Sequence, residues 1–213
     1  MTRAIKAVAK DALQFWLFRG SFAWRLPSGT RSVALTFDDG PDPVFTTQVL
    51  EVLARQRVPA TFFLVGRKAV ARPDLVQAIA RAGNAIGNHS HAHVEYTQLS
   101  RSGRLADWTA AQSVFAQILQ FRPTLFRPPR GRISLAVLRH LRALNQRLIL
   151  WTRTSSDYRQ DGADAIYARV HPDAVRPGEI LLFHDHNAGT VAAIARLIPE
   201  LLARGFRFQH LLS

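Results

Sequence analysis

The chain has 213 residues, of which 47% are hydrophobic and 20% charged, and it contains no cysteine. This length and composition indicate one globular domain and exclude a disordered chain, while the lack of cysteine excludes disulfides, zinc–thiolate sites and thiol nucleophiles. The formal net charge of +13 permits a nucleic acid, an anionic membrane surface or an acidic substrate as partner, and it does not choose among them.

The excess positive charge lies in two regions. Residues 1–31 contain six basic residues and one acidic residue, and residues 108–156 contain eight arginines and no Asp or Glu. These two regions account for the whole formal net charge, so the rest of the chain is balanced. The arginines follow no recognised nucleic-acid-binding motif, so we do not expect a nucleic acid as partner.

Residues 1–30 are expected to form a basic amphipathic helix and a lead-in to the domain. Apolar residues recur there at helical spacing, and Arg3, Lys6 and Lys10 lie on another face. Two interpretations stay open, a helix docked on its own domain or an interfacial helix on an anionic membrane surface. The uncharged run 12–18 is too short to span a membrane and no signal-peptide cleavage site follows it. We therefore expect a cytoplasmic protein, or one peripheral on the cytoplasmic face of the membrane.

From residue 31 to residue 213, short apolar runs alternate with helical patterns. The predicted strands cover residues 32–37, 60–65, 85–88, 125–127, 148–151, 180–183 and 206–211. The predicted helices cover residues 46–55, 73–82, 104–119, 135–144, 163–170 and 191–203. Strands that alternate with helices indicate an α/β fold with a parallel sheet, open or closed into a barrel, and nothing marks a second domain.

Polar clusters follow several of these strands. The first contains the adjacent carboxylates Asp38 and Asp39, followed by Gly40 and Pro41. One carboxylate can bind a metal while the other stays free as a base, because different environments separate their pKa values. The alternative is a plain turn, since Asp-Asp-Gly-Pro is also a good turn sequence.

The second cluster holds His89, His91 and His93 within five residues. His89 and His93 stand four apart, so a helical turn would present both imidazoles on one side, with His91 facing away. Two histidines and one carboxylate form a known catalytic metal set. The alternative is a solvated histidine-rich loop.

Three more clusters follow later strands. In Arg127-Pro128-Pro129-Arg130 the prolines stiffen the backbone, and Arg127 could pair with a carboxylate. The next runs from Trp151 to Tyr158 and contains Asp157, and the last contains His184 at the end of an apolar strand. An imidazole there is a candidate general acid that Asp157 could hold in one tautomer.

The five clusters, in this order, resemble those of the polysaccharide deacetylases, carbohydrate esterase family four, which contain the NodB-homology domain. The resemblance covers the chain from Val33 to the C-terminus. It implies a distorted (β/α) barrel of seven parallel strands, with the site at their carboxyl ends as in other such barrels. It also implies metal-dependent hydrolysis of the N-acetyl group of an aminosugar in an oligo- or polysaccharide or a glycolipid, with release of acetate.

The same resemblance implies catalytic roles for four residues. Asp38 would be the general base and Arg127 would hold it. His184 would be the general acid, and Asp157 would tune that histidine.

The resemblance further implies a metal site and a substrate site. Asp39, His89 and His93 would hold one divalent metal ion, with zinc favoured and cobalt, nickel or manganese as alternatives. Leu182 would line the acetyl pocket, and Tyr158 stands where the family usually has Trp. The residues expected to contact substrate are Pro41, Pro129, Arg130, Tyr158 and Leu182.

Three alternative functions remain open. The basic N-terminal helix and the arginine-rich stretch favour a variant in which the enzyme deacylates a polyprenyl-phosphate-linked sugar at the inner membrane face. A basic nucleic-acid-binding protein is the alternative from a different class, and an inactive sugar-binding relative is a third. Arg130 stands where the family commonly has an aromatic or small residue, so the sugar-binding wall differs from the usual one.

Overall fold

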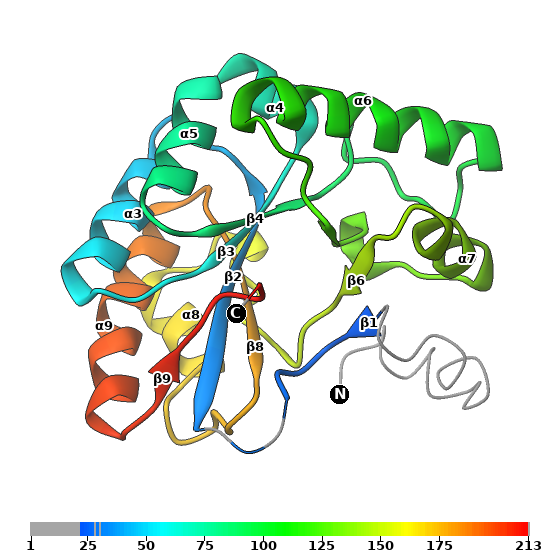
Figure 1. Cartoon of the computed structure of the whole chain (residues 1–213). Helices are drawn as coiled ribbons and strands as arrows, with labels where there is room; N and C mark the ends of the chain where they lie inside the picture. Colours follow the sequence, from blue (N-terminus) through cyan, green and yellow to red (C-terminus); the bar gives the residue numbers. More distant parts are fainter. Residues whose placement is uncertain (1–21, 28, 30, 213) are drawn as a thin grey trace.

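The computed structural model describes residues 22–27, 29 and 31–212, which form a curled parallel sheet flanked by helices (Figure 1). The strands are β1 (Phe22–Ala23), β2 (Ser32–Gly40), β3 (Thr61–Leu64), β4 (Ala85–Asn88), β5 (Leu125–Phe126), β6 (Arg147–Ile149), β7 (Arg153–Thr154), β8 (Ile180–His184) and β9 (Arg207–Phe208). The helices are α3 (Phe45–Gln56), α4 (Gly66–Ala71), α5 (Pro73–Arg81), α6 (Arg101–Leu119), α7 (Leu135–Ala143), α8 (Ala163–Arg169) and α9 (Ala188–Ala203). Short 3₁₀ turns cover Pro129–Gly131 and Asp157–Arg159.

The strand order is β1-β6-β5-β4-β3-β2-β8-β7, and β9 pairs with the first residues of β2. All these strand pairs are parallel. No pairing among the described residues joins β1 to β7, so the barrel is open along one side. The expected distorted barrel of parallel strands is therefore confirmed.

The seven predicted strands are all present, but the described part of the chain has nine. The two additional strands, β1 and β7, have two residues each, too few to show a hydrophobic pattern. Phe22 and Ala23, which we assigned to the lead-in, pair with β6 at the sheet edge. The predicted amphipathic helix falls on residues 1–21, outside the described residues.

The alternation of side chains along β2 decides which of them enter the barrel. Val33, Leu35 and Phe37 belong to the core that the sheet shares with α3 and α9, whereas Ala34 belongs to a second cluster. Since successive side chains on a strand point to opposite faces, Thr36 and Asp38 lie on the same face as Ala34. A buried apolar strand thus carries polar side chains into the barrel interior.

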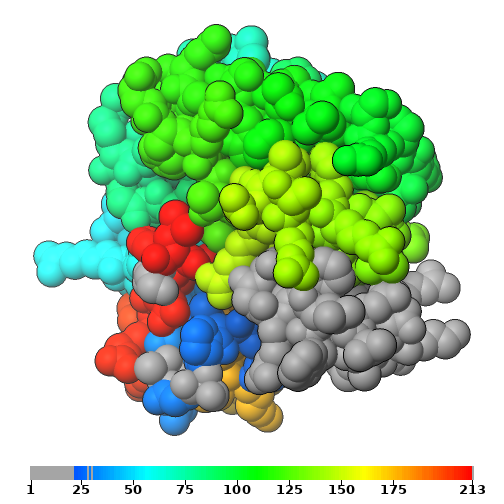
Figure 2. Space-filling model, turned by 45° about the vertical axis from the view of Figure 1, so that its right-hand side comes forward, coloured from blue at the N-terminus to red at the C-terminus, as the bar shows by residue number. Residues whose placement is uncertain are grey.

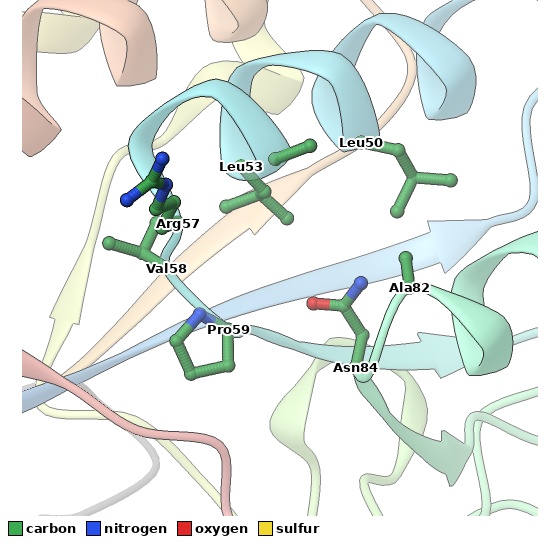
Figure 3. A pocket seen from close by; sticks show the side chains of 8 residues that line it. Leu50, Leu53, Arg57, Val58, Pro59, Ala82 and Asn84 are labelled. Carbon is green, nitrogen blue, oxygen red and sulfur yellow. The ribbon is translucent and has the colours of Figure 1, made fainter.

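The amino end of the barrel is covered by the C-terminal segment. Leu211 packs in the cluster that includes Ala34, and its backbone N–H donates to Thr61 Oγ1 at 3.0 Å. Figure 2 shows this segment in red at the surface. A pocket at the same end, before β3 and β4, is lined by residues that include Leu53, Arg57 and Asn84 (Figure 3).

None of the helices formed by the described residues combines the length and the apolar character that crossing a membrane requires.

Candidate active site

The site lies at the carboxyl ends of the strands, where β2 and β8 run side by side. Asp38 and His184 are register partners on these two strands, which brings a carboxylate and an imidazole together across 146 residues of chain. A β-bulge separates Asp38 from Gly40, and Asp39, between them, has a left-handed backbone with φ 71°. The bulge turns the second carboxylate toward the site, a common use of bulges near active sites.

Arg127 holds Asp38 inside the barrel. Its Nη1 donates to Asp38 Oδ1 at 2.7 Å and to Thr36 Oγ1 at 2.8 Å. Its other donors reach the carbonyls of Ile149 and Leu150 at 3.3 and 3.1 Å. The guanidinium is fully buried, and burial lowers its pKa although the charge of Asp38 opposes this. A buried ion pair of this kind depends on both partners, because either charge alone would be uncompensated.

The loop after β4 carries His89 and His93, but it is not helical. Ser90 and His93 both have left-handed backbones, with φ 75° and 56°, and these turns bring the two imidazole centroids to 5.2 Å. The expected helical turn was therefore wrong, although its consequence, two imidazoles on one side, is present. His91 lies outside this pair. Its ring packs against Gly66, and a Cβ at Gly66 would come within 2.6 Å of His91 Nδ1.

Asp39, His89 and His93 form a group that could hold a metal ion. Asp39 Oδ1 lies 3.2 Å from His89 Nε2 and 2.9 Å from His93 Nε2, yet this buried oxygen has no hydrogen-bond partner among the described residues. Burial raises the pKa of the Asp39 carboxyl, but the two imidazoles outweigh this and hold its pKa well below its usual range. His89 Nδ1 contacts the carbonyl of Arg127 at 2.7 Å, which places the proton on Nδ1 and leaves Nε2 free as a ligand. Two imidazole nitrogens and one anionic oxygen, itself buried and without a hydrogen-bond partner among the described residues, fit a divalent cation.

His184 faces the same centre from β8. Its Nδ1 contacts Asp157 Oδ1 at 2.7 Å, and its Nε2 lies 3.9 Å from Asp39 Oδ2. Burial lowers the pKa of His184, but the hydrogen bond and charge of Asp157, with the charges of Asp38 and Asp39, outweigh burial and raise it to about 9. Asp157 is itself fixed, since its Oδ2 accepts from Thr190 Oγ1 and from the His184 backbone N–H, both at 2.7 Å.

The residues expected to bind substrate lie around this centre to different degrees. Leu182 is two residues before His184 on β8 and so shares its face. Tyr158 is 56% exposed, and its ring meets that of His184 edge-on at 6.1 Å. Pro41 and Pro129 follow β2 and β5 and are buried, while Arg130 is exposed and its Nη1 is 3.6 Å from Glu95 Oε2.

Several residues of the site were missed by the sequence reasoning. Thr36 and Thr190 bond to Arg127 and Asp157, and Lys68 Nζ donates to the carbonyl of Asp39 at 2.7 Å. Each comes from another strand or helix than its partner, and the sequence carries no signal for such contacts.

Asp185, in the loop directly after β8, is buried. It accepts a hydrogen bond from Thr46, and burial raises its pKa to about 7. A Cβ at Gly40 would come within 2.5 Å of its carboxylate, so glycine is required there.

Comparison with known proteins identifies the family of the chain. A family profile described as polysaccharide deacetylase matches residues 25–149, more than half of the chain. A peptidoglycan-N-acetylglucosamine deacetylase of Bacillus cereus is 35% identical over 89% of this chain and 90% of its own length. A chitooligosaccharide deacetylase of Sinorhizobium fredii is 36% identical over 88% of this chain and 93% of its own. A solved peptidoglycan N-acetylglucosamine deacetylase superposes with a TM-score of 0.88 at 32% identity, covering 92% of this chain and 94% of that one.

The chain therefore belongs to the polysaccharide deacetylase family, carbohydrate esterase family four. Members are hydrolases that act on the N-acetyl amide bonds of sugars, and this chain is an enzyme of that class.

Proposed function

We propose that the protein hydrolyses the N-acetyl group of an aminosugar in an oligo- or polysaccharide or a glycolipid, and that it depends on one divalent metal ion. One observation carries the proposal. The Asp39, His89 and His93 cluster lies between a carboxylate paired with a buried arginine and an imidazole paired with a buried carboxylate. Metal-assisted hydrolysis needs a cation, a base and an acid around one reacting centre.

Asp39, His89 and His93 would hold the metal, and zinc suits two imidazoles and a carboxylate best, with cobalt, nickel and manganese as alternatives. When bound, such an ion polarises a carbonyl and makes water more acidic. The relatives named for peptidoglycan and chitooligosaccharide deacetylation support an N-acetylated sugar as the substrate.

Two residues move protons in this proposal. Asp38 Oδ2 faces the cluster, 3.9 Å from His89 Nε2, while its Oδ1 is occupied by Arg127, so Oδ2 is free to take a proton from the attacking water. His184 Nε2 faces the same centre, and Asp157 holds the opposite ring nitrogen. The His184 Nε2 is placed to give a proton to the departing amine.

The remaining substrate contacts are assigned from position. Leu182 would line the acetyl pocket beside His184, and Tyr158 would supply an aromatic wall to the sugar. Pro41, Pro129 and Arg130 would border the site.

The products test this reaction. N-acetylchitooligosaccharides incubated with the zinc-loaded protein should release acetate and free amine in equal amounts, because the bond broken is an amide. Acetate assay and amine labelling of the same sample measure both. Acetate without an equal amount of free amine would contradict amide hydrolysis, and the absence of both products would contradict the proposal.

The rim of the site carries positive charge, which supports an anionic substrate. Arg67, Arg132 and Arg159 are exposed and follow β3, β5 and β7 at the carboxyl edge of the sheet. No carboxylate of the described residues lies within ion-pair distance of these three side chains, whereas Arg130 is offset by Glu95. Guanidinium groups bind carboxylate and phosphate oxygens well. We infer a sugar that carries an acidic group, a lactyl carboxylate or the phosphate of a polyprenyl carrier.

Replacing Arg67, Arg132 and Arg159 by Gln should lower kcat/KM for an acidic substrate by about 3- to 30-fold, because three exposed charge interactions are lost. The neutral chitooligosaccharide should be unaffected. Assays with a peptide-free N-acetylmuramic acid oligosaccharide, which has a free lactyl carboxylate, and with a polyprenyl-phosphate-linked N-acetylglucosamine distinguish the two sources of charge.

The matched control replaces Arg55, Arg57 and Arg81 by Gln, which removes the same charge from the opposite end of the sheet. Arg57 lines the pocket in Figure 3, and the other two lie in the last turns of α3 and α5. This control should leave kcat/KM unchanged for all substrates. Equal losses in both triple variants, or none in the rim variant, would contradict a rim that recognises anions.

A further inference from the structure

Asp107, on α6, contacts the loop that carries the two candidate metal-binding histidines. Its Oδ1 accepts from the backbone N–H of His91 at 3.0 Å, and its Oδ2 accepts from that of Ala92 at 3.0 Å. The hydroxyl of Tyr96, which is fully buried, donates to Oδ1 at 2.7 Å. One carboxylate therefore receives three hydrogen bonds from residues 91–96.

The same loop is held from its other side by α4. The backbone N–H of Gly66 donates to the carbonyl of Ser90, and that of Arg67 donates to the carbonyl of His91, both at 3.0 Å. The Ser90 N–H donates to Asn88 Oδ1 at 2.8 Å. The carbonyls of Ser90 and His91 are thus bonded to α4, and the backbone N–H groups of His91 and Ala92 are bonded to Asp107.

This arrangement matters because the loop is neither helix nor strand. Ser90 and His93 have left-handed backbones, which cost energy in residues other than glycine. His93 is partly exposed, with 31% of its side chain accessible, so packing alone does not fix it. Hydrogen bonds to the loop backbone must therefore hold His93 opposite His89.

We propose that Asp107 is a positioning residue that sets the metal affinity of the site by fixing the loop between His89 and His93. It touches none of the three candidate ligands, and it acts through the backbone of His91 and Ala92 and through Tyr96. The inference rests on the proposed metal site. Groups behind metal ligands commonly change metal affinity by about 10- to 100-fold when they are removed.

The test measures Zn²⁺ affinity of the whole protein by competition with a chromophoric chelator. Asp107→Asn should weaken Zn²⁺ binding by about 10- to 100-fold, because an amide nitrogen replaces one of the two acceptor oxygens. At saturating Zn²⁺, kcat on N-acetylchitooligosaccharide should return close to the wild-type value, since no reacting group is altered.

Two further variants complete the design. Asp74→Asn makes the same chemical change on α5, where Asp74 is exposed and paired with Arg72, and it should leave Zn²⁺ affinity unchanged. Tyr96→Phe removes one hydrogen bond to Asp107 and keeps both carboxylate oxygens, so a smaller loss of about two- to tenfold is expected. If Asp107→Asn fails to fold, the Zn²⁺ affinity of Tyr96→Phe tests the role of Asp107.

The outcomes separate the two proposals. Zn²⁺ binding by the wild type with equal affinity in Asp107→Asn and Tyr96→Phe would overturn the role of Asp107 and leave the metal site intact. A wild type that binds no divalent metal would overturn the proposed function itself. A lower melting temperature with unchanged Zn²⁺ affinity would show a structural role only, and would likewise overturn the inference.

Discussion

Asp38→Asn is expected to lower kcat/KM on an N-acetylated oligosaccharide by about 10²- to 10⁴-fold, the range that a general base contributes, while the metal stays bound. Asn has nearly the same shape and can still accept the hydrogen bond of Arg127 through its oxygen. It cannot take a proton from water. The three candidate metal ligands are unchanged, so metal content should match that of the wild type.

The same substitution leaves the Arg127 guanidinium buried without a compensating charge. Removing one partner of a buried ion pair costs about 3–5 kcal/mol when nothing replaces it, and the remaining hydrogen bond should reduce that cost here. The melting temperature of the variant should therefore be measured by thermal denaturation, and the kinetic assay should be run at a temperature where the variant is folded. Retained turnover in a folded Asp38→Asn protein would contradict the assignment of the base.

His89→Ala is expected to abolish both metal binding and turnover. It removes a ligand nitrogen and also the contact between His89 Nδ1 and the Arg127 carbonyl, so the loss of affinity should exceed the roughly 10- to 100-fold caused by groups behind the ligands. Excess metal should restore little activity, since two ligands hold a divalent ion poorly. Metal analysis after dialysis and acetate release measure the two effects.

The matched control for His89→Ala is His91→Ala, in the same loop. His91 is outside the candidate ligand group, and its ring packs against Gly66. It should keep the metal and most of its activity. Loss of metal from His91→Ala and retention in His89→Ala would reverse the ligand assignment.

The hydrophobic pattern predicted most of the fold because the burial of apolar side chains determines which face of each strand and helix points to the core. In β2, Val33, Leu35 and Phe37 pack against helices, and the alternate residues Thr36 and Asp38 must then face the barrel. Parallel strands also bring their carboxyl ends to one edge. Clusters far apart in the sequence could for this reason be expected at a single site.

The contacts that orient the site could not be predicted in the same way. The hydrogen bonds of Thr190 to Asp157 and of Asp107 to the histidine loop join different elements, and their geometry depends on how helices pack. The left-handed backbone of His93 has no sequence signal either, since left-handed residues are usually glycine or asparagine.

The arginines of residues 108–156 occupy two different environments in the structure. Arg127 is buried in the site, whereas Arg132 is exposed on its rim. The arginine-rich stretch therefore supplies a buried residue that holds Asp38 and an exposed residue at the rim, where we propose that an acidic substrate binds. A count of charges along the sequence cannot separate these two uses.

We propose that the two adjacent carboxylates have separate roles, in which Asp39 binds the metal and Asp38 transfers the proton. The most direct test measures zinc content and acetate release in the same preparations of wild type, Asp38→Asn and His89→Ala. We predict zinc with turnover, zinc without turnover, and neither, in that order. Loss of zinc from Asp38→Asn, or turnover by a zinc-free His89→Ala protein, would contradict the claim.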